Sequence, residues 1–359
     1  MRIGKRSAAS FILVALMLHS MNLYADVDVG VYYFPGWVES KPLKPSDPWA
    51  KIKKYPDKKP LAGWYKDGDR LVTDRQISWM HDAGINFVIY DWYWLEKSGV
   101  TLNQSVDAFM DSKSKKGLKF SILWANHFDS PQSIETFDSM VSYWVTNYFT
   151  SPDYKTIDGK PVVFIFSPGE LERKARGFGK SSRELIERAR RRAIQSGMKG
   201  IYFVGATQAS SGNVSSITNN GYDALTAYNY HYGMSGSRSK SSRPSTSYQE
   251  LADGYKQSWE WFVENAKIPY FVPVTSGWDK RPWGGSKSLD HDKSISTPQG
   301  FGAHVSAAKK IINANREKTG GRMIVCCWNE YGEGSHIEPT VKFGTEYIES
   351  LKRAIESED

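Results

Sequence analysis

Eight short apolar runs alternate with amphipathic stretches along the chain and predict an α/β fold, a single (β/α)8 TIM-type barrel with long loops after its strands. Strands separated by helices favour a parallel sheet with right-handed crossovers, and eight strands close such a barrel. An open doubly wound sheet is the alternative. That sheet more often carries a G-x-G-x-x-G turn after its first strand. The turn here is Phe34-Pro35-Gly36-Trp37, so the barrel is favoured.

The predicted elements follow one another in strand-then-helix order. The strands are Val27–Phe34, Asn86–Asp91, Lys119–Trp124, Pro161–Phe166, Gly200–Gly205, Ala224–Tyr228, Tyr270–Val274 and Arg322–Trp328. The helices are Asp74–Ala83, Asn103–Lys116, Ser133–Tyr148, Ser181–Ser196, Asn213–Asn219, Ser247–Asn265, Pro298–Asn315 and Thr345–Glu356. Gly84, Gly117 and Gly197 follow three of these helices at positions where glycine commonly ends a helix.

Three long loops follow predicted strands: Val38–Leu71, Gly233–Thr246 and Lys280–Thr297. In a barrel all three lie at the C-terminal face, where barrel active sites are found. We expect the first and third to form walls around a substrate. The second is rich in Ser and Arg, and a plain flexible chain is an equal alternative.

The N-terminus predicts export. Residues 1–25 combine an early positive charge, a short apolar run and a small-residue cleavage site at Ala25, as a secretory signal does. We therefore expect a signal peptide at 1–25, one catalytic domain at 26–359, and a periplasmic or extracellular protein. An uncleaved anchor is the alternative. No later segment is long and apolar enough for stable membrane insertion.

Charge, cysteine content and motifs argue against several classes of function. The formal charge is +8, and removal of three basic residues with the signal leaves 8 − 3 = +5. The basic run at 188–192 is interpreted as a solvated helix face, so no nucleic-acid partner is predicted. Cys326 and Cys327 are interpreted as two small buried thiols rather than a vicinal disulfide. Asp290-His291-Asp292 is interpreted as a solvated loop, so we predict no metal and no cofactor.

Two carboxylates follow the last predicted strand. Glu330 and Glu333 lie three positions apart in the glycine-rich segment Trp328–Pro339. Cleavage of a glycosidic bond needs such a pair, one group as proton donor and the other as base or nucleophile. A solvated acidic loop is the alternative. Glu338, in the same segment, is interpreted as structural.

Aromatic and polar residues gather at the other strand ends, as a sugar-binding cleft requires: flat rings to stack on sugars, and polar groups to bond their hydroxyls. The candidate substrate-binding residues are Tyr33, Trp37, Asp91, Trp92, Trp94, Asn126, His127, Gln208, Tyr228, Asn229, His231, Trp278, Asp279, Asn329 and Tyr331. Alternatives stay open at several of them. For Asp91, a helix cap or a pair with a lysine is an equal alternative, and His127 and His231 also fit ordinary loop histidines.

The chain resembles the glycoside hydrolase family 99-like proteins, also called WbsX-type, over essentially its whole length after the signal. The motifs that carry the resemblance are Trp328-Asn329-Glu330-Tyr331-Gly332-Glu333-Gly334, Ile337-Glu338-Pro339, Val31-Tyr32-Tyr33-Phe34-Pro35-Gly36-Trp37, Tyr90-Asp91-Trp92-Tyr93-Trp94, Trp124-Ala125-Asn126-His127 and Ser276-Gly277-Trp278-Asp279-Lys280-Arg281-Pro282. The resemblance implies a (β/α)8 barrel with endo-acting α-mannosidase activity and retention of anomeric configuration.

By the same resemblance, Glu330 acts as a base on the sugar 2-hydroxyl and gives a 1,2-anhydro intermediate. Glu333 acts as general acid on the leaving oxygen and then as base toward water. Family members carry an aromatic residue and a histidine between the two glutamates, whereas this chain has Tyr331 and Gly332. The departure weakens the inference of α-mannoside specificity.

Together these observations predict an exported glycoside hydrolase that acts on an oligo- or polysaccharide with an α-linkage. A non-catalytic glycan-binding barrel is one alternative, and a glycosyltransferase-like protein of polysaccharide assembly is another. Export argues against the latter, because nucleotide sugars are cytosolic.

Overall fold

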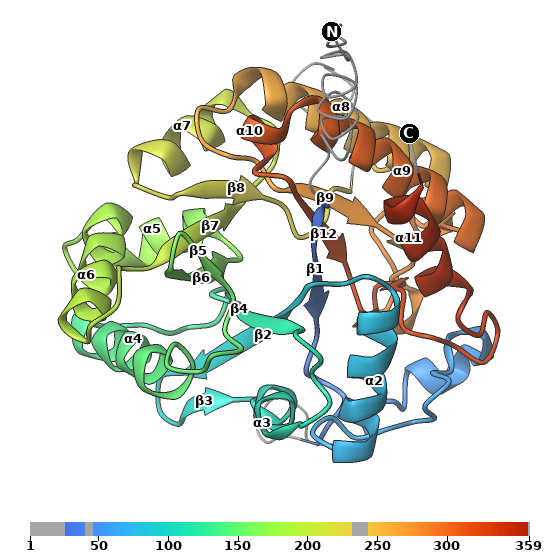
Figure 1. The fold of residues 1–359 in the computed structure, drawn as a ribbon, viewed down its shortest axis with the longest axis horizontal. Coiled ribbons are helices and arrows are strands. Elements are labelled where there is room, and N and C mark those ends of the chain that lie inside the picture. Colours follow the sequence, from blue (N-terminus) through green and yellow to red (C-terminus); the bar gives the residue numbers. More distant parts are fainter. Residues whose placement is uncertain (1–25, 40–45, 232–242, 358–359) are drawn as a thin grey trace, which may run out of the picture.

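A closed ring of eight parallel strands forms the centre of the protein (Figure 1). The computed structural model describes residues 26–39, 46–231 and 243–357. The ring strands are β1 (Asp28–Tyr33), β2 (Phe87–Leu95), β4 (Lys119–Trp124), β6 (Lys160–Ile165), β7 (Tyr202–Ala206), β8 (Ala224–Thr226), β9 (Val272–Thr275) and β12 (Arg322–Cys326). The predicted (β/α)8 barrel is thereby confirmed.

Strand pairing follows chain order around the ring, and the first strand pairs with the last. Val31 of β1 lies opposite Val325 of β12 on one side and Val88 of β2 on the other. The ring closes between β8 and the residues before β9, where Leu225 and Tyr270 form a parallel bridge. Closure of the ring brings all eight strand ends to one face, as the prediction of a shared site required.

Helices surround the strands (Figure 1). They are α2 (Arg70–Asp82), α3 (Gln104–Asp111), α4 (Ile134–Asn147), α5 (Pro168–Gly177), α6 (Ser182–Gln195), α7 (Ser211–Asn219), α8 (Tyr248–Asn265), α9 (Pro298–Ala314), α10 (Arg316–Thr319) and α11 (Glu346–Glu356). Several begin at a side-chain cap. Ser181 and Glu184, for example, form a reciprocal capping box at α6. No helix among the described residues is long and apolar enough to cross a membrane.

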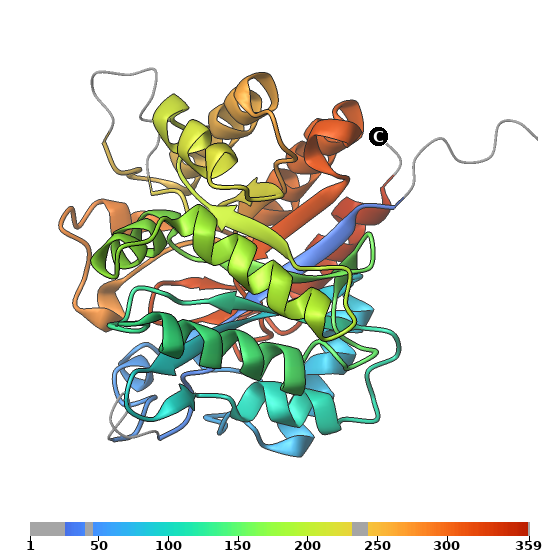
Figure 2. The same ribbon diagram turned by 90° about the vertical axis from the view of Figure 1, so that its left-hand side faces the viewer.

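The sequence missed two helices, α5 and α10, and several short elements beside the ring. The short strands are β3 (Gly99–Thr101), β5 (Thr156–Ile157), β10 (Gly277–Trp278), β11 (Ser294–Ile295), β13 (Asn329–Glu330) and β14 (Ser335–His336). The 3-10 turns are η1 (Ile52–Lys54), η2 (Pro56–Lys58), η3 (Arg281–Trp283) and η4 (His291–Lys293). In Figure 2 the loop containing η3 and η4, coloured orange, lies at the left-hand end of the barrel.

The apolar core forms two layers. One cluster includes Tyr32, Ile89 and Phe164, and a larger one includes Val31, Val88 and the buried helix faces. Because neighbouring strand residues point to opposite sides, the first cluster fills the ring and the second packs between the ring and the helices. This alternation decides which strand-end side chains face the cavity.

The cysteine pair and the predicted signal peptide were also interpreted from the sequence. Cys326 and Cys327 are buried and joined to each other by a disulfide, so the interpretation as two separate thiols was wrong. The predicted signal, residues 1–25, lies outside the described residues. So do residues 233–242 of the Ser- and Arg-rich loop.

Candidate active site

A cavity of about 800 Å³ opens at the C-terminal ends of the strands. Its lining includes Glu330, Glu333 and seven of the candidate substrate-binding residues: Asp91, His127, Gln208, Tyr228, Asn229, His231 and Trp278. Five further rings line it: Phe34, Tyr93, Phe128, Phe166 and Trp283. The cavity therefore combines carboxyl groups, amides and aromatic faces in one space.

Glu330 and Asp91 lie on either side of one tyrosine. The Tyr228 hydroxyl oxygen is 3.1 Å from Glu330 Oε1 and 3.2 Å from Asp91 Oδ2. Asp91 and Glu330 are only 5% and 4% exposed, respectively. Burial raises the pKa of Asp91 well above its usual range, the Tyr228 hydrogen bond opposes this, and the charge of Glu333 adds to it.

Glu333 has a different environment. Burial raises the pKa of its carboxyl to about 7, and the positive charge of Lys280 acts in the opposite direction. A carboxyl with a pKa near 7 is partly protonated at neutral pH, so it can donate a proton to a leaving group. The two glutamates of the motif are thus placed in unlike surroundings, as separate roles require.

The segment between the two glutamates is a tight turn. Glu330 ends β13, which pairs with β14, and the Glu333 amide donates to the Glu330 carbonyl at 3.2 Å. Asn329 binds the backbone of Phe34 in both directions, which ties this turn to the end of β1. Glu338 lies beneath the turn, where it accepts hydrogen bonds from Tyr65, Gln76 and Tyr331. The structural interpretation of Glu338 fits these contacts.

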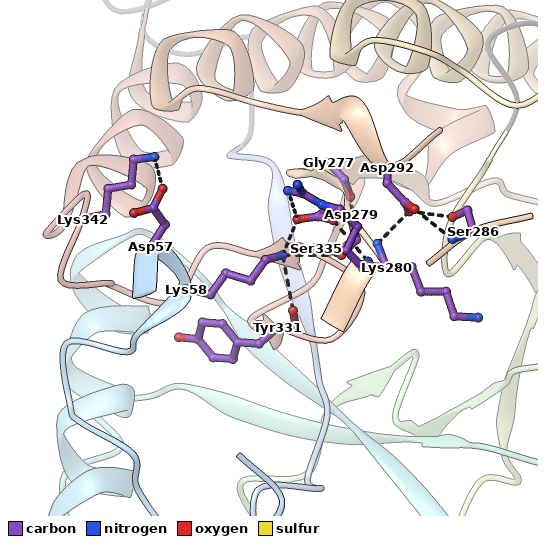
Figure 3. Close-up of polar contacts among 11 residues, drawn as sticks. Asp57, Lys58, Gly277, Asp279, Lys280, Ser286, Asp292, Tyr331, Ser335 and Lys342 are labelled. Carbon is purple, nitrogen blue, oxygen red and sulfur yellow. Dashed lines mark hydrogen bonds and ion pairs between the residues drawn. The ribbon is translucent and has the colours of Figure 1, made fainter. Parts of the chain in front are cut away.

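A buried ion pair supports the turn from the side (Figure 3). Lys58 Nζ lies 3.0 Å from Asp279 Oδ2 and donates to the Tyr331 carbonyl at 3.5 Å. The Asp279 amide in turn donates to the Glu333 carbonyl at 2.6 Å. The loop after β1 and the segment after β10 therefore meet at the backbone that carries the two glutamates.

Gly332 packs directly against a tryptophan ring. A Cβ atom at this position would lie 2.1–2.5 Å from three ring atoms of Trp283. Trp283 comes from η3, in the loop after β10, and its ring meets Phe34 edge-on at 5.8 Å between centroids. The absence of a side chain at 332 thus lets the Trp283 ring occupy that space beside the cavity.

Eight candidate substrate-binding residues lie outside the cavity lining: Tyr33, Trp37, Trp92, Trp94, Asn126, Asp279, Asn329 and Tyr331. Their side chains contact the protein itself. Tyr33 bonds Asp67 and Gln76, for example, and Trp37 stacks on Trp49 at 3.9 Å.

The alternation along β2 separates Asp91 from Trp92 and Trp94, which pack against Tyr143 outside the ring. Asn126 binds the backbone of Ser167. We therefore propose no substrate contact for these eight residues.

The predicted loop walls differ from one another. The third loop supplies Trp283 to the cavity, together with the neighbouring Trp278. The described part of the first loop supplies no lining residue, because its aromatic residues pack with Trp37 and Tyr331 in a cluster of their own. Residues of α7, for which the sequence predicts no functional role, also line the cavity.

No group of three or more metal-binding side chains is arranged around a common point in the described ranges. In Asp290-His291-Asp292, Asp292 accepts from the backbone of Lys280 and Ser286, and Asp290 pairs with Lys293. His291 Nδ1 lies 3.1 Å from the Ser245 hydroxyl. His291 and Asp292 are buried, so the interpretation as a solvated loop was wrong for these two residues. Asp292 instead holds the third loop in shape through its bonds to the backbone.

A family model described as Glycosyltransferase WbsX matches residues 34–351. The fold is similar to the GH99 endo-alpha-mannosidase from Bacteroides thetaiotaomicron in complex with bis-tris-propane, with 19% identity, a TM-score of 0.62, and coverage of 92% of this chain and 96% of that one. A structure described as a glycoside hydrolase-like protein matches at 15% identity and a TM-score of 0.63, covering 94% and 96%.

The family 1 β-glucosidase from Thermotoga maritima has 11% identity and a TM-score of 0.54, with 94% and 99% covered. No curated protein matches the sequence. At these identities the structural matches show a shared fold, the barrel found in glycoside hydrolases.

Proposed function

This chain belongs to the family described as Glycosyltransferase WbsX, and we propose that it is an exported glycoside hydrolase that cleaves an α-linked glycan. The observation that carries the proposal is the pair of carboxyl groups in one cavity, Glu330 bonded to Tyr228 and Glu333 with a pKa of about 7. One group suited to accept a proton and one suited to donate it are what glycosidic cleavage requires.

In the proposed reaction, Glu333 donates its proton to the leaving oxygen as the bond to the anomeric carbon breaks. Glu330 takes the proton of the sugar 2-hydroxyl, whose oxygen bonds to the anomeric carbon and forms a 1,2-anhydro sugar. Glu333, now ionised, takes a proton from water, and the water oxygen attacks the anomeric carbon. The bond from that carbon to O2 breaks, and Glu330 returns its proton to O2. Each of the two displacements inverts the anomeric carbon, so together they retain its configuration.

The cavity lining supports a carbohydrate as substrate. Trp278, Trp283 and Tyr93 offer rings that suit the apolar faces of sugars. Asn229 is 8% exposed, its Oδ1 accepts from Tyr255, and its Nδ2 has no partner among the described residues. This donor is buried in the cavity wall, and a sugar hydroxyl would satisfy it once the Asn229 amide turns toward the cavity. The relationship to the endo-alpha-mannosidase fold supports an α-mannoside as the first substrate to test.

The family's description favours a second candidate, transfer of a sugar from an activated donor. A glycosyltransferase of this kind should bind a sugar nucleotide, and binding to the native state raises the melting temperature. Thermal protection by a sugar nucleotide, without cleavage of any glycan, would favour transfer over hydrolysis. A glycan-binding barrel would instead be protected by glycans that it leaves intact.

The deciding experiment is digestion of a panel of α-linked glycans, read by product mass. We expect the wild-type protein to release smaller oligosaccharides, and Glu330→Gln and Glu333→Gln each to reduce the rate at least about 100-fold. Glu356→Gln, an exposed change on α11, serves as the matched control and should cleave normally. Full activity in both cavity variants would refute the proposed pair.

A further inference from the structure

Tyr228 lies between two buried carboxyl groups with its ring held from two sides. Its centroid is 4.8 Å from that of Tyr32 and 5.4 Å from that of Phe166. The hydroxyl oxygen is 3.2 Å from Asp91 Oδ2 and 3.1 Å from Glu330 Oε1. Both separations are close to ordinary hydrogen-bond lengths, so the question is where the protons lie.

A tyrosine hydroxyl carries one proton, and an ionised carboxylate only accepts. If Asp91 and Glu330 were both ionised, the Tyr228 proton would serve one of them and the other contact would join two oxygens with no proton between them. Such a contact is repulsive and costly where water is excluded. One of the two carboxyl groups must therefore bring its own proton.

The surroundings of Asp91 favour the neutral form there. Its carboxyl has no Lys or Arg partner in the described part of the chain, and Oδ1 has no hydrogen-bond partner there either. The titratable groups that face it are Tyr32, Tyr93, Tyr228, Glu333 and, across the Tyr228 hydroxyl, Glu330, and none of these is a cation. Burial and the charge of Glu333 raise the pKa of Asp91, which agrees with the proton count.

We propose that Asp91 is a positioning residue that stays protonated, donates from Oδ2 to the Tyr228 oxygen, and thereby commits the Tyr228 proton to Glu330. The inference rests on the proposed function in one respect, since it takes Glu330 as the ionised base.

The proton on Asp91 can be tested without any substrate. We expect the infrared difference spectrum between wild type and Asp91→Asn at pH 7 to contain the C=O stretch of a protonated carboxylic acid. The matched control is Glu250→Gln, because Arg243 lowers the pKa of Glu250 to about 2, and its difference spectrum should contain carboxylate bands and no C=O stretch of a protonated acid beside the amide bands of the new side chain. Carboxylate bands without that C=O stretch in the Asp91→Asn difference spectrum would overturn the proposal.

The positioning role is tested by turnover and its pH profile. Asp91→Asn keeps a donor toward Tyr228, so it should retain the wild-type rate within a few-fold and the same profile. Tyr228→Phe removes the hydrogen bond to Glu330 and should lower turnover about 10- to 100-fold. Its acidic limb should move to higher pH, because ionised Glu330 has lost a donor. Asp91→Ala leaves the Tyr228 hydroxyl without the donor that orients it, so turnover should fall by about 10-fold.

Equal losses in Asp91→Asn and Asp91→Ala would mean that Asp91 acts as an anion, which contradicts the proposal. A wild-type protein that cleaves no glycan would instead contradict the proposed function. In that case the infrared measurement still decides whether Asp91 is protonated.

Discussion

Substitution of Gly332 by alanine should displace the Trp283 ring. The new Cβ would lie 2.1 Å from the nearest ring atom, whereas ordinary contacts begin near 3.4 Å, so the ring must retreat by about 1 Å. The backbone at 332 is not in the left-handed region, so alanine itself fits the chain there. Overpacking of this kind costs about 1–3 kcal/mol, and we expect the free energy of unfolding to fall by that amount.

A double-mutant cycle isolates the contact. In a Trp283→Ala background the methyl group at 332 has no ring to meet, so Gly332→Ala should cost about 0 kcal/mol, and the coupling should equal the whole loss. Gly177→Ala is the matched control, because a Cβ there meets nothing within 4 Å and should be neutral or slightly stabilising.

Urea denaturation of the four proteins in the cycle measures these differences, and equilibrium binding of a cleaved glycan to each shows whether the ring also contacts substrate. Since Trp283 lines the cavity, Gly332→Ala should weaken binding as well as stability. The same loss of stability from Gly332→Ala in both backgrounds would refute the reasoning, because the ring would then not be its cause.

Two further substitutions test the groups that surround the motif. Lys280→Met removes the positive charge that lowers the pKa of Glu333, so that pKa should rise above about 7. Because Glu333 must be protonated to act as an acid, the alkaline limb of the pH profile of turnover should move to higher pH. An unchanged limb would contradict the effect of Lys280 on Glu333. Lys58→Met removes one of the two cations that pair with buried Asp279. Because Arg281 still pairs with Asp279, we expect the free energy of unfolding to fall by about 1–3 kcal/mol, whereas Lys342→Met, at an exposed pair, should cost under about 1 kcal/mol. Equal losses in urea denaturation would show that burial of the Lys58 pair does not matter.

The barrel and the central part of the site were predictable from local pattern. Apolar runs with helices between them are a property of each segment, and the ring then brings the strand ends together wherever they occur in the chain. Asp91 on β2 and Tyr228 after β8 come together in this way although 137 residues separate them in the sequence. The location of Glu330 and Glu333 was predictable from the position of the last strand alone, because both residues follow it closely.

The direction of each strand side chain, into the ring or out toward the helices, also follows from local pattern. Asp91 has the same parity on β2 as Ile89, which lies in the cluster within the ring, whereas Trp92 has the parity of Val88, which lies in the outer cluster. The candidate substrate-binding residues therefore come from both faces of the strands, and only those that point into the ring can reach the cavity.

Other features depend on loops that the sequence does not place. Trp283 meets Gly332, and Lys58 meets Asp279, only because two irregular segments fold over the same turn. Gly332 departs from the family pattern, but nothing in the sequence around it indicates that the Trp283 ring occupies the space beside it. The proposed proton on Asp91 rests on distances between oxygen atoms, which no local pattern specifies.

The separate roles of Glu330 and Glu333 are tested most directly by fluoride release from the α-glycosyl fluoride of the sugar that the digestion panel identifies. Fluoride leaves without a proton from an acid, so Glu333→Gln should still release a stoichiometric burst of fluoride in its first turnover while losing cleavage of the natural glycan. Glu330→Gln should release none. Equal loss of burst and glycan cleavage in both variants, or a full burst from Glu330→Gln, would contradict the assigned roles.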